Sequence, residues 1–334
     1  MSSQYTAQQI LSFSSFNQLF SKDGSEKELR TLRHQWHPDR CKDKLATDVF
    51  THISALYELG FVPPEVEYIN KDGKNAAYLF EAKYKTSFGM AYVRNGSVAY
   101  VFEDDYLFLI DLFKQNFKEY SDNLQKSKHL KNYEYSLFRV YPINSPQNIL
   151  ILQLPKDFVP VIYLMNHFNG AIEPRIVAWI LSRCFDIGML YRSMDRVANG
   201  FDLELLYVDL EGHRVLDLNP MFYSVGRNAK LKALSSNTVS MYPADCLYNK
   251  TAESKCDVAL IKALGVRLLG DATYTGALLG SSIPSALKQW LTSPTLKGKL
   301  ESYSEWQQKV LINAFGARKF YKYVVPVAQL LKGK

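Results

Sequence analysis

The chain has 334 residues, of which 47% are hydrophobic and 22% are charged. This length exceeds the usual range of a single domain, and the composition excludes a disordered or collagen-like chain. The net charge of +7 is uneven: residues 1–64 carry seven cations and seven anions, residues 65–224 carry 17 and 20, and residues 225–334 carry 16 and six. The last third is therefore a candidate surface for an acidic partner, nucleic acid or a phosphorylated surface, and a solvated basic face with no partner explains it equally well.

The sequence contains no targeting or metal-binding pattern. Cys41, Cys184, Cys246 and Cys256 are too scattered for zinc-ligand or CxxC spacing, so a reducing cytosol is the simplest location. The N-terminal residues lack the basic and apolar regions of a secretory signal. The strongest apolar run, FVPVIYLMNHF, is interrupted by Pro160 and is shorter than the ~18 residues of a membrane helix. We therefore expect a cytoplasmic protein with no membrane segment, no metal and no cofactor.

The first sixty residues predict helices. Apolar residues recur at mixed spacings of three and four between Ile10 and Phe20, and SKDGS then interrupts the pattern. Ser25 and Glu28 have the spacing of a capping box, so a helix should begin near residue 26. Its buried face is expected to contain Leu29, Leu32 and Trp36.

A third helix should follow the HPDRCKDK loop. Thr47 can cap it, and Gly60 followed by Pro63 and Pro64 should end it. The predicted buried stripe of this helix consists of Val49, Phe50, Ile53, Leu56 and Tyr57.

From about residue 76 the pattern changes to that of strands. Three short runs are rich in β-branched and aromatic residues: AAYLFEAKYK, MAYVRNG and SVAYVFE. Asn95 and Gly96, between the last two, form a strong hairpin signal. Helical spacing returns in DDYLFLIDLFKQNFKEYSDNL, and NILILQLP predicts a compact buried strand that ends at Pro155.

Beyond residue 155 the chain is predicted to be mainly helical. The clearest helical segments are PRIVAWILSRCFDIGMLYRSM, CDVALIKALGVRLLG, IPSALKQWLT and YSEWQQKVLINAF. Between the first two, LELLYVDLEGHRVLDLN predicts two paired strands with a turn at Glu211 and Gly212.

A His-Pro-Asp sequence lies between the second and third predicted helices, within LRHQWHPDR at residues 32–40. Pro38 has no amide hydrogen and disfavours helical geometry at His37, so the helix should end there and display the next residues in a loop. A short helix, a basic helix, this loop and an amphipathic helix together resemble the J-domain, the module by which J-proteins stimulate the ATPase of DnaK-type chaperones. The resemblance covers about residues 5–60.

The resemblance implies that the loop and the basic face before it dock on the chaperone. The implied chaperone-binding residues are His37, Pro38, Asp39, Lys27, Arg30, Arg33 and Arg40. Asp39 would accept charge-assisted hydrogen bonds from an arginine of the partner. A simple helix stop is an alternative interpretation of the motif. A general acid–base pair is another, and it conflicts with an exposed loop that offers no desolvated pocket.

The rest of the chain lacks the glycine- and phenylalanine-rich segment and the zinc module of general J-proteins. A hairpin, a long helix, a strand and a helical body with a β-pair have the order of the bilobal protein-kinase fold, which residues 76–327 resemble. The local resemblances are to the helix before the catalytic loop, the catalytic loop with the DFG region, the APE segment and the helix whose aspartate anchors that loop. In the same order, these four features correspond to GAIEPRIVAWILSRCFDIGMLYR, VANGFDLELLYVDLEGHRVLDLN, MYPADCLYN and KCDVALIKALGVRLLG. FGARKFYKYVVP resembles the end of degenerate kinase-like domains fused to J-domains in bacteria and phages.

The residues that phosphoryl transfer requires are missing. A kinase needs a glycine-rich phosphate loop, a lysine, a catalytic aspartate, and metal-binding asparagine and aspartate. The chain has no GxGxxG and no lysine at the expected hairpin position. The resemblance puts Gly200 at the catalytic aspartate and Leu205 at the asparagine, and Asp202 is displaced by two residues. Asp217 remains as a DFG-like aspartate and Asp257 as the anchor, although capping a turn and holding loop backbone are structural alternatives for these two.

The predicted fold class is α+β. A small all-α J-domain (1–62) and a linker (63–75) precede a bilobal kinase-like domain (76–334). The β-rich small lobe would span about 76–154 and the helical large lobe about 155–334.

These patterns predict a J-domain co-chaperone that recruits a DnaK-type chaperone while an inactive kinase-like domain, a pseudokinase, binds an unknown client. One alternative is an atypical protein kinase with displaced catalytic residues. Another is a structural or virion-associated adaptor that binds nucleic acid through the basic last third, where FYKYVV lies beside Lys319 and Lys322. Helix-packing aromatic residues with solvated lysines are the preferred interpretation of that stretch.

Overall fold

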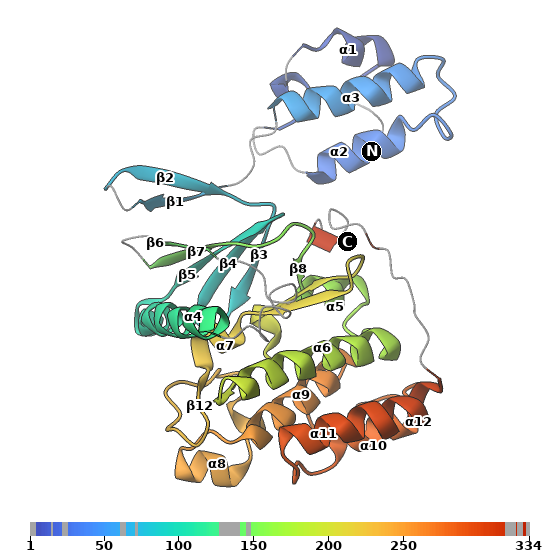
Figure 1. Cartoon of the computed structure of the whole chain (residues 1–334). Coiled ribbons are helices and arrows are strands. Elements are labelled where there is room, and N and C mark those ends of the chain that lie inside the picture. The colour runs from blue at the N-terminus through green and yellow to red at the C-terminus, as the bar shows by residue number, and fades with distance from the viewer. Residues whose placement is uncertain are drawn as a thin grey trace. The chain divides into compact units, whose positions relative to one another are not determined.

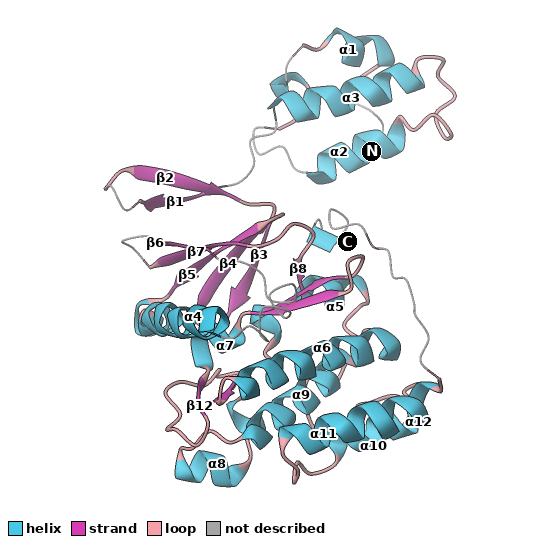
Figure 2. Ribbon diagram, in the orientation of Figure 1, coloured by secondary structure: helices cyan, strands magenta, loops and turns pink. Residues whose placement is uncertain are grey.

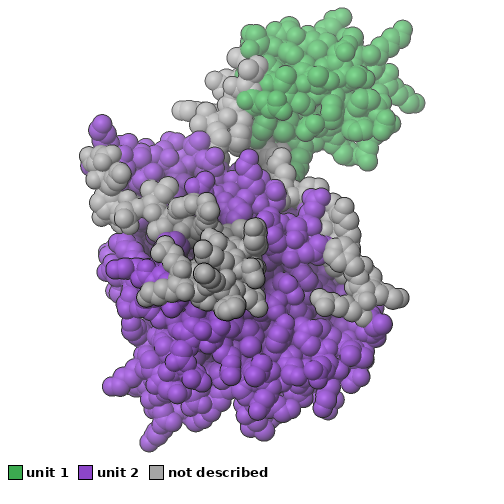
Figure 3. All heavy atoms as spheres, in the orientation of Figure 1, with its two compact units in different colours: residues 1–64 green, residues 65–334 purple. Residues whose placement is uncertain are grey.

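The computed structural model describes residues 5–14, 16–21, 26–60, 65–70, 73–126, 141–144, 148–317, 325 and 330–331. The chain divides into two compact units, residues 1–64 and residues 65–334 (Figure 3). Helices and antiparallel strands are both present, which confirms the predicted α+β class. No helix in the described part of the chain is long and apolar enough to cross a membrane.

The described secondary structure of unit 1 is helical (Figures 1 and 2). Its elements are α1 (Ala7–Ser12), the short 3₁₀ helix η1 (Phe16–Gln18), α2 (Glu26–Gln35) and α3 (Ala46–Gly60). α2 begins where the capping-box pattern predicts, although Ser25 lies outside the described residues. The prediction that Thr47 caps α3 is wrong, because the helix already begins at Ala46. Asp43 closes the turn before it by accepting the Leu45 N–H at 2.9 Å.

One apolar core holds the three helices of unit 1 together. α1 and α2 both pack against α3. The buried side chains are Ala7, Ile10, Phe16, Phe20, Leu29, Trp36, Val49, Ile53, Leu56 and Tyr57. Four of the five residues of the predicted α3 stripe are among them, and the fifth, Phe50, is half-buried.

A five-stranded antiparallel sheet forms the first part of unit 2, with the strand order β3-β4-β5-β7-β6. The strands are β3 (Ala82–Thr86), β4 (Gly89–Arg94), β5 (Ser97–Phe102), β6 (Tyr141–Asn144) and β7 (Ile149–Gln153). Asn95 and Gly96 form the predicted turn between β4 and β5, and Gly96 takes the left-handed φ of 86° that such turns favour. α4 (Phe108–Lys126) lies between β5 and β6 in the chain.

A separate hairpin packs against the outer face of this sheet. It consists of β1 (Glu65–Ile69) and β2 (Asn75–Leu79). Tyr78 packs with Ile149 and Ile151, and its hydroxyl lies 2.8 Å from Ser97 Oγ. Residues 65–69, assigned to a linker from the sequence, are thus a strand. AAYLFEAKYK is likewise two strands rather than one, because the chain changes sheets after Leu79.

The remainder of unit 2 is mainly helical (Figure 1). The helices are α5 (Val161–His167), α6 (Pro174–Ser193), α7 (Asn219–Tyr223), α8 (Ala244–Asn249), α9 (Ser254–Leu268), α10 (Ser285–Thr292), α11 (Lys299–Glu305), the π-helix η6 (Trp306–Val310) and α12 (Leu311–Phe315). β8 (Val159–Pro160), β10 (Leu206–Asp209) and β11 (Arg214–Asp217) form one small sheet, and β9 (Arg196–Val197) pairs with β12 (Val225–Gly226). The pair β10–β11 and its turn lie where the sequence predicts them.

A buried ion pair joins the three central helices α6, α9 and α11. Lys299 Nζ contacts the carboxylate of Asp257, and both side chains are fully buried. The same ammonium donates to the Gly188 carbonyl oxygen at 2.9 Å. A buried charge that loses its partner is strongly destabilising, so each group depends on the other.

Replacing Lys299 with methionine should therefore lower the free energy of unfolding by about 3–5 kcal/mol, because Asp257 would remain buried without its cation. Lys297→Met is the matched control, since Lys297 pairs with Glu305 but 55% of its side chain is exposed. That exposed pair should contribute at most about 1 kcal/mol. Urea denaturation followed by tryptophan fluorescence measures both, and equal losses would contradict the assignment.

Candidate functional site

The predicted His-Pro-Asp segment forms a turn between α2 and α3 (Figure 1). The N–H groups of Arg40 and Cys41 both donate to the His37 carbonyl oxygen at 2.9 Å. The Asp39 N–H donates to His37 Nδ1 at 3.2 Å, which leaves Nε2 to carry the proton of the neutral ring. Pro38, Asp39 and Arg40 are exposed, and 87% of the Asp39 side chain is accessible. The turn is thus closed by its own backbone and offers its charged groups to solvent.

Phe50 of α3 supports this turn. The Arg33 guanidinium lies 4.7 Å from the centre of the Phe50 ring, and the His37 ring meets Phe50 edge-on with the ring centres 5.6 Å apart. Phe50 is half-buried, and two polar side chains pack on its ring. Arg40 in turn contacts His34 Nε2. Sequence reasoning missed Phe50 and His34, since neither lies within the motif.

The two faces of α2 differ in charge. Leu29 and Trp36 belong to the core of unit 1. The cationic residues predicted to contact the chaperone are exposed on the helix: Lys27, Arg30 and Arg33. Through Phe50, the structure brings Arg33 of this face next to the turn. The side chains predicted to bind the chaperone therefore form one exposed, largely cationic surface beginning at α2 and ending at Arg40.

A second candidate site lies inside unit 2, where the five-stranded sheet and α4 meet the helical part. We call it the junction, and its side chains come from β3, β5, α4, loop 198–205, β10, β11 and α7. The Asp257 carboxylate fixes the loop: it accepts the N–H of Ala198 at 3.1 Å and that of Asn199 at 2.8 Å. Asn199 and Phe201 have left-handed φ values of 55° and 117°. Such strained backbone persists only where the surroundings enforce it.

The two loop positions that the resemblance assigns to catalysis are filled by the protein itself. A Cβ on Gly200 would lie 2.1 Å from Asn219 Cβ and 3.1 Å from the Asn219 carbonyl carbon, so no side chain fits there. Leu205 is buried in the hydrophobic core. Neither position presents a polar group to the junction.

Asp217 and Asp202, the two aspartates singled out near this loop, have different partners. Asp217 Oδ1 accepts the Asn219 N–H at 3.0 Å and its Nδ2 at 2.6 Å, while Oδ2 is buried without a hydrogen-bond partner in the described structure. Burial raises the pKa of Asp217 to about 7. Asp202 accepts hydrogen bonds from Ser235 Oγ and, at 3.0 Å, from Asn237 Nδ2, and burial raises its pKa as well.

Three tyrosine hydroxyls cross the junction. Tyr84 of β3 donates to the Glu204 carbonyl oxygen at 2.7 Å and lies 3.2 Å from the hydroxyl of Tyr207 on β10. Tyr100 of β5 lies 2.6 Å from the same Tyr207 hydroxyl. The single hydroxyl hydrogen of Tyr84 is donated to this carbonyl, so Tyr84 must be the acceptor in its hydrogen bond with Tyr207. The Tyr207 hydroxyl then accepts the hydrogen bond from Tyr100. Burial raises the pKa of all three, so the phenols stay neutral at physiological pH.

The turn between β3 and β4 is fastened to loop 198–205. Glu204 Oε2 accepts the Ser87 N–H at 2.7 Å and the Ser87 hydroxyl at 2.8 Å. Beside it, Phe88 stacks on Phe102 and Phe222, with ring centres 4.9 Å and 5.8 Å apart. The space under this turn is therefore occupied by the protein's own aromatic side chains.

α4 is tied to the helical part by Arg196 of β9. Its guanidinium forms an ion pair with Glu119 of α4. It also donates to Asn116 Oδ1 at 2.8 Å and to the Ser224 carbonyl oxygen at 2.9 Å. These contacts fix α4 against the β9–β12 pair.

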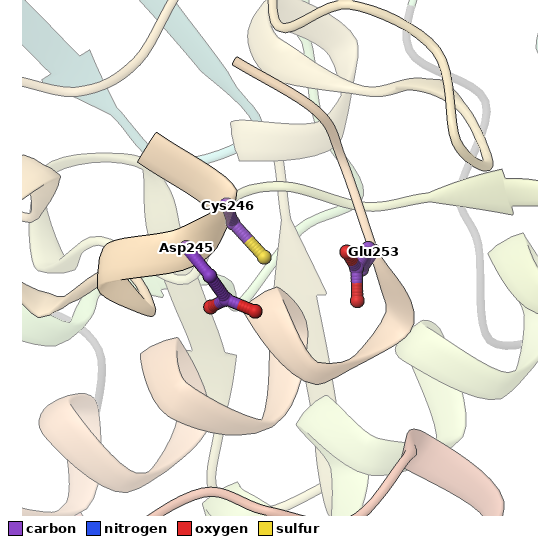
Figure 4. Close-up of side chains that lie close together, drawn as sticks. All are labelled: Asp245, Cys246 and Glu253. Carbon is purple, nitrogen blue, oxygen red and sulfur yellow. The ribbon is translucent and has the colours of Figure 1, made fainter. Parts of the chain in front are cut away.

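One further cluster, missed from the sequence, could offer metal ligands (Figure 4). Asp245, Cys246 and Glu253 each place one ligand atom within 4.8 Å of the others. The ammonium of Lys255 already pairs with both carboxylates, at 3.2 Å from Glu253 Oε2. Burial raises the pKa of Cys246, which opposes the thiolate that a metal requires. The ion pairs account for this cluster, and we assign it no metal.

Apart from Val325, the FYKYVV stretch, with Lys319 and Lys322, lies outside the described residues. The same holds for most of FGARKFYKYVVP, so the interpretations given to both stay predictions from the sequence.

The buried carboxyl of Asp217 predicts a pH dependence of stability. Its pKa in the folded chain, about 7, exceeds its ordinary value of 3.8. As the pH falls between these values, the folded chain takes up a proton that the unfolded chain does not, so stability should rise by up to about 1.4 kcal/mol per pH unit. Asp217→Asn should be more stable than the unsubstituted chain near pH 8, and the difference should vanish near pH 4. Urea denaturation across this range measures it, and a pH-independent difference would refute it.

No protein-family model matches this chain, and neither does any curated protein. Its function must therefore be inferred from its own residues and their geometry.

Proposed function

We propose that this chain is a J-domain co-chaperone in which unit 1 recruits and stimulates a DnaK-type chaperone and unit 2 is a catalytically inactive kinase-like domain that binds a client. The observation that carries the proposal is the exposed His37–Pro38–Asp39 turn between two packed helices. Its geometry is fixed from within, and a cationic helix face leads up to it.

Unit 1 would act by binding alone. The cations of α2 favour an acidic surface on the chaperone and would speed association by electrostatic attraction. The Asp39 carboxylate lies 3.6 Å from His37 Nδ1, and with 87% of its side chain exposed it can accept charge-assisted hydrogen bonds from that surface. His37 is oriented by Phe50 and by the Asp39 N–H, so binding costs little further ordering of the turn.

Two features of unit 2 support a kinase-like body. The first is the order of its elements: hairpin strands, a long helix, two further strands, a helical part and an inserted β-pair. The second is Asp257, which holds the backbone of the loop before β10 as the resemblance implies. DFG-like Asp217 closes a turn with Asn219, the structural role considered for it from the sequence.

Three features support the absence of phosphoryl transfer. Gly200 has no room for a catalytic carboxylate. Tyrosine hydroxyls and phenylalanine rings fill the junction where a kinase would place nucleotide. A kinase also requires an ion pair between a strand lysine and a helix glutamate, whereas Glu119 of α4 pairs with Arg196 of β9.

His37→Gln should abolish stimulation of the cognate DnaK-type ATPase, because glutamine cannot reproduce the imidazole packed on Phe50. Single-turnover ATP hydrolysis by the chaperone measures the effect. His167→Gln makes the same change in unit 2 and should leave stimulation unaltered. Stimulation that survives His37→Gln would overturn the co-chaperone assignment.

An atypical kinase is the second candidate, favoured by one observation: the unpaired, buried Oδ2 of Asp217 is of the kind that could receive a cation. We expect ATP with Mg²⁺ to leave the thermal unfolding midpoint unchanged, because the junction is filled. Bound nucleotide would raise the midpoint by mass action. A rise in the unsubstituted chain that disappears in Asp217→Ala would favour the kinase over the pseudokinase.

A further inference from the structure

The basic last third of the chain contains cations of three kinds. Some donate hydrogen bonds to backbone carbonyl oxygens of the fold: Lys262, Lys288 and Lys299. Others form ion pairs with carboxylates: Arg227, Lys255 and Lys297. A third group is exposed and has no carboxylate partner within the described structure: Lys230, Lys232, Lys250 and Lys309. Within the described part of the last third, this group offers exposed charge to a partner.

Three of these four lysines lie together. The Leu231 N–H donates to the Lys250 carbonyl oxygen at 2.9 Å, and Lys230 forms a bridge with Thr251. Lys232 follows directly in the chain, and its Nζ has a neutral partner, Gln115 Oε1, at 3.4 Å. The backbone segments around Lys230 and Lys250 are thus paired, and they place three exposed lysines at neighbouring backbone positions next to the end of α8.

The acids near these lysines are already neutralised. Asp195 pairs with Arg227 at 2.8 Å, and Asp245 and Glu253 both pair with Lys255. The positive charge of the three lysines is therefore not cancelled by the carboxylates around it. Like charges held together without compensation favour binding of an anion.

Tyr248 adds an aromatic ring to this surface. It lies on α8 two residues before Lys250 and is 88% exposed. So large an exposed ring contributes nothing to the core. We call Tyr248 with Lys230, Lys232 and Lys250 the lysine patch.

We propose that the lysine patch binds single-stranded nucleic acid, with the lysines on phosphates and Tyr248 stacked on a base. Lysines serve as point charges for a phosphate backbone, and an exposed aromatic ring stacks on any base. An acidic peptide fits less well, because carboxylates are best held by arginine forks and the nearby Arg227 is already bound to Asp195. This inference is independent of the co-chaperone assignment.

Fluorescence anisotropy of the full chain with a labelled oligothymidylate of about 15 nucleotides tests the proposal. Binding should weaken with salt. Lys230→Ala, Lys232→Ala and Lys250→Ala combined should weaken it further and lower the log–log salt slope by about 2, or about 0.7 for each lost phosphate contact. Lys309→Ala, which removes an exposed lysine outside the patch, is the control and should leave the slope unchanged.

Tyr248 gives a second readout that does not depend on charge. Tyr248→Ala should weaken binding at least about fivefold, and Tyr248→Phe should retain it because stacking needs only the ring. The proposal fails if the chain does not bind the oligonucleotide at low salt, or if the triple variant binds as the unsubstituted chain does. It fails equally if poly-glutamate competes through the same lysines at lower concentration, which would identify an acidic protein as the partner.

Discussion

The Asp257 carboxylate is the constraint on which unit 2 depends. From α9 it holds two N–H groups of loop 198–205 and the ammonium of Lys299, which also binds α6. All of these groups are out of water, so none can be lost without exposing the others to an unpaired buried charge. The loop can therefore keep the positive φ values of Asn199 and Phe201.

The two units use polar groups in opposite ways. In unit 1 a proline ends a helix, and the polar groups that follow it face solvent. Phe50 contacts two polar side chains of this region, Arg33 and His37. In unit 2 the polar groups of the junction are buried and bonded to one another. The first arrangement suits recognition of a partner. The second stabilises unit 2 from within.

Long periodic segments could be predicted from the sequence, and so could features fixed by one local residue. α6, α9 and the β10–β11 pair follow from apolar periodicity, and the turn after α2 follows from Pro38. The β1–β2 hairpin was missed because EVEYI is short. Its alternating polar and apolar residues are explained only by the sheet on which the apolar side chains pack. The Lys299–Asp257 pair and the support of His37 by Phe50 join residues that no local pattern connects. Such contacts are set by tertiary packing, which a single sequence does not display.

The tyrosine chain of the junction has a direction. Tyr100 donates a hydrogen bond to Tyr207, Tyr207 donates to Tyr84, and Tyr84 donates to the Glu204 carbonyl oxygen. Its two ends are not equivalent, since loss of the Tyr100 hydroxyl removes only a donor, whereas loss of the Tyr84 hydroxyl leaves a carbonyl without its donor and a proton without its acceptor. Phenylalanine should therefore replace tyrosine at position 100 at a lower cost in stability than at position 84. Related chains should lose this network from its donor end first.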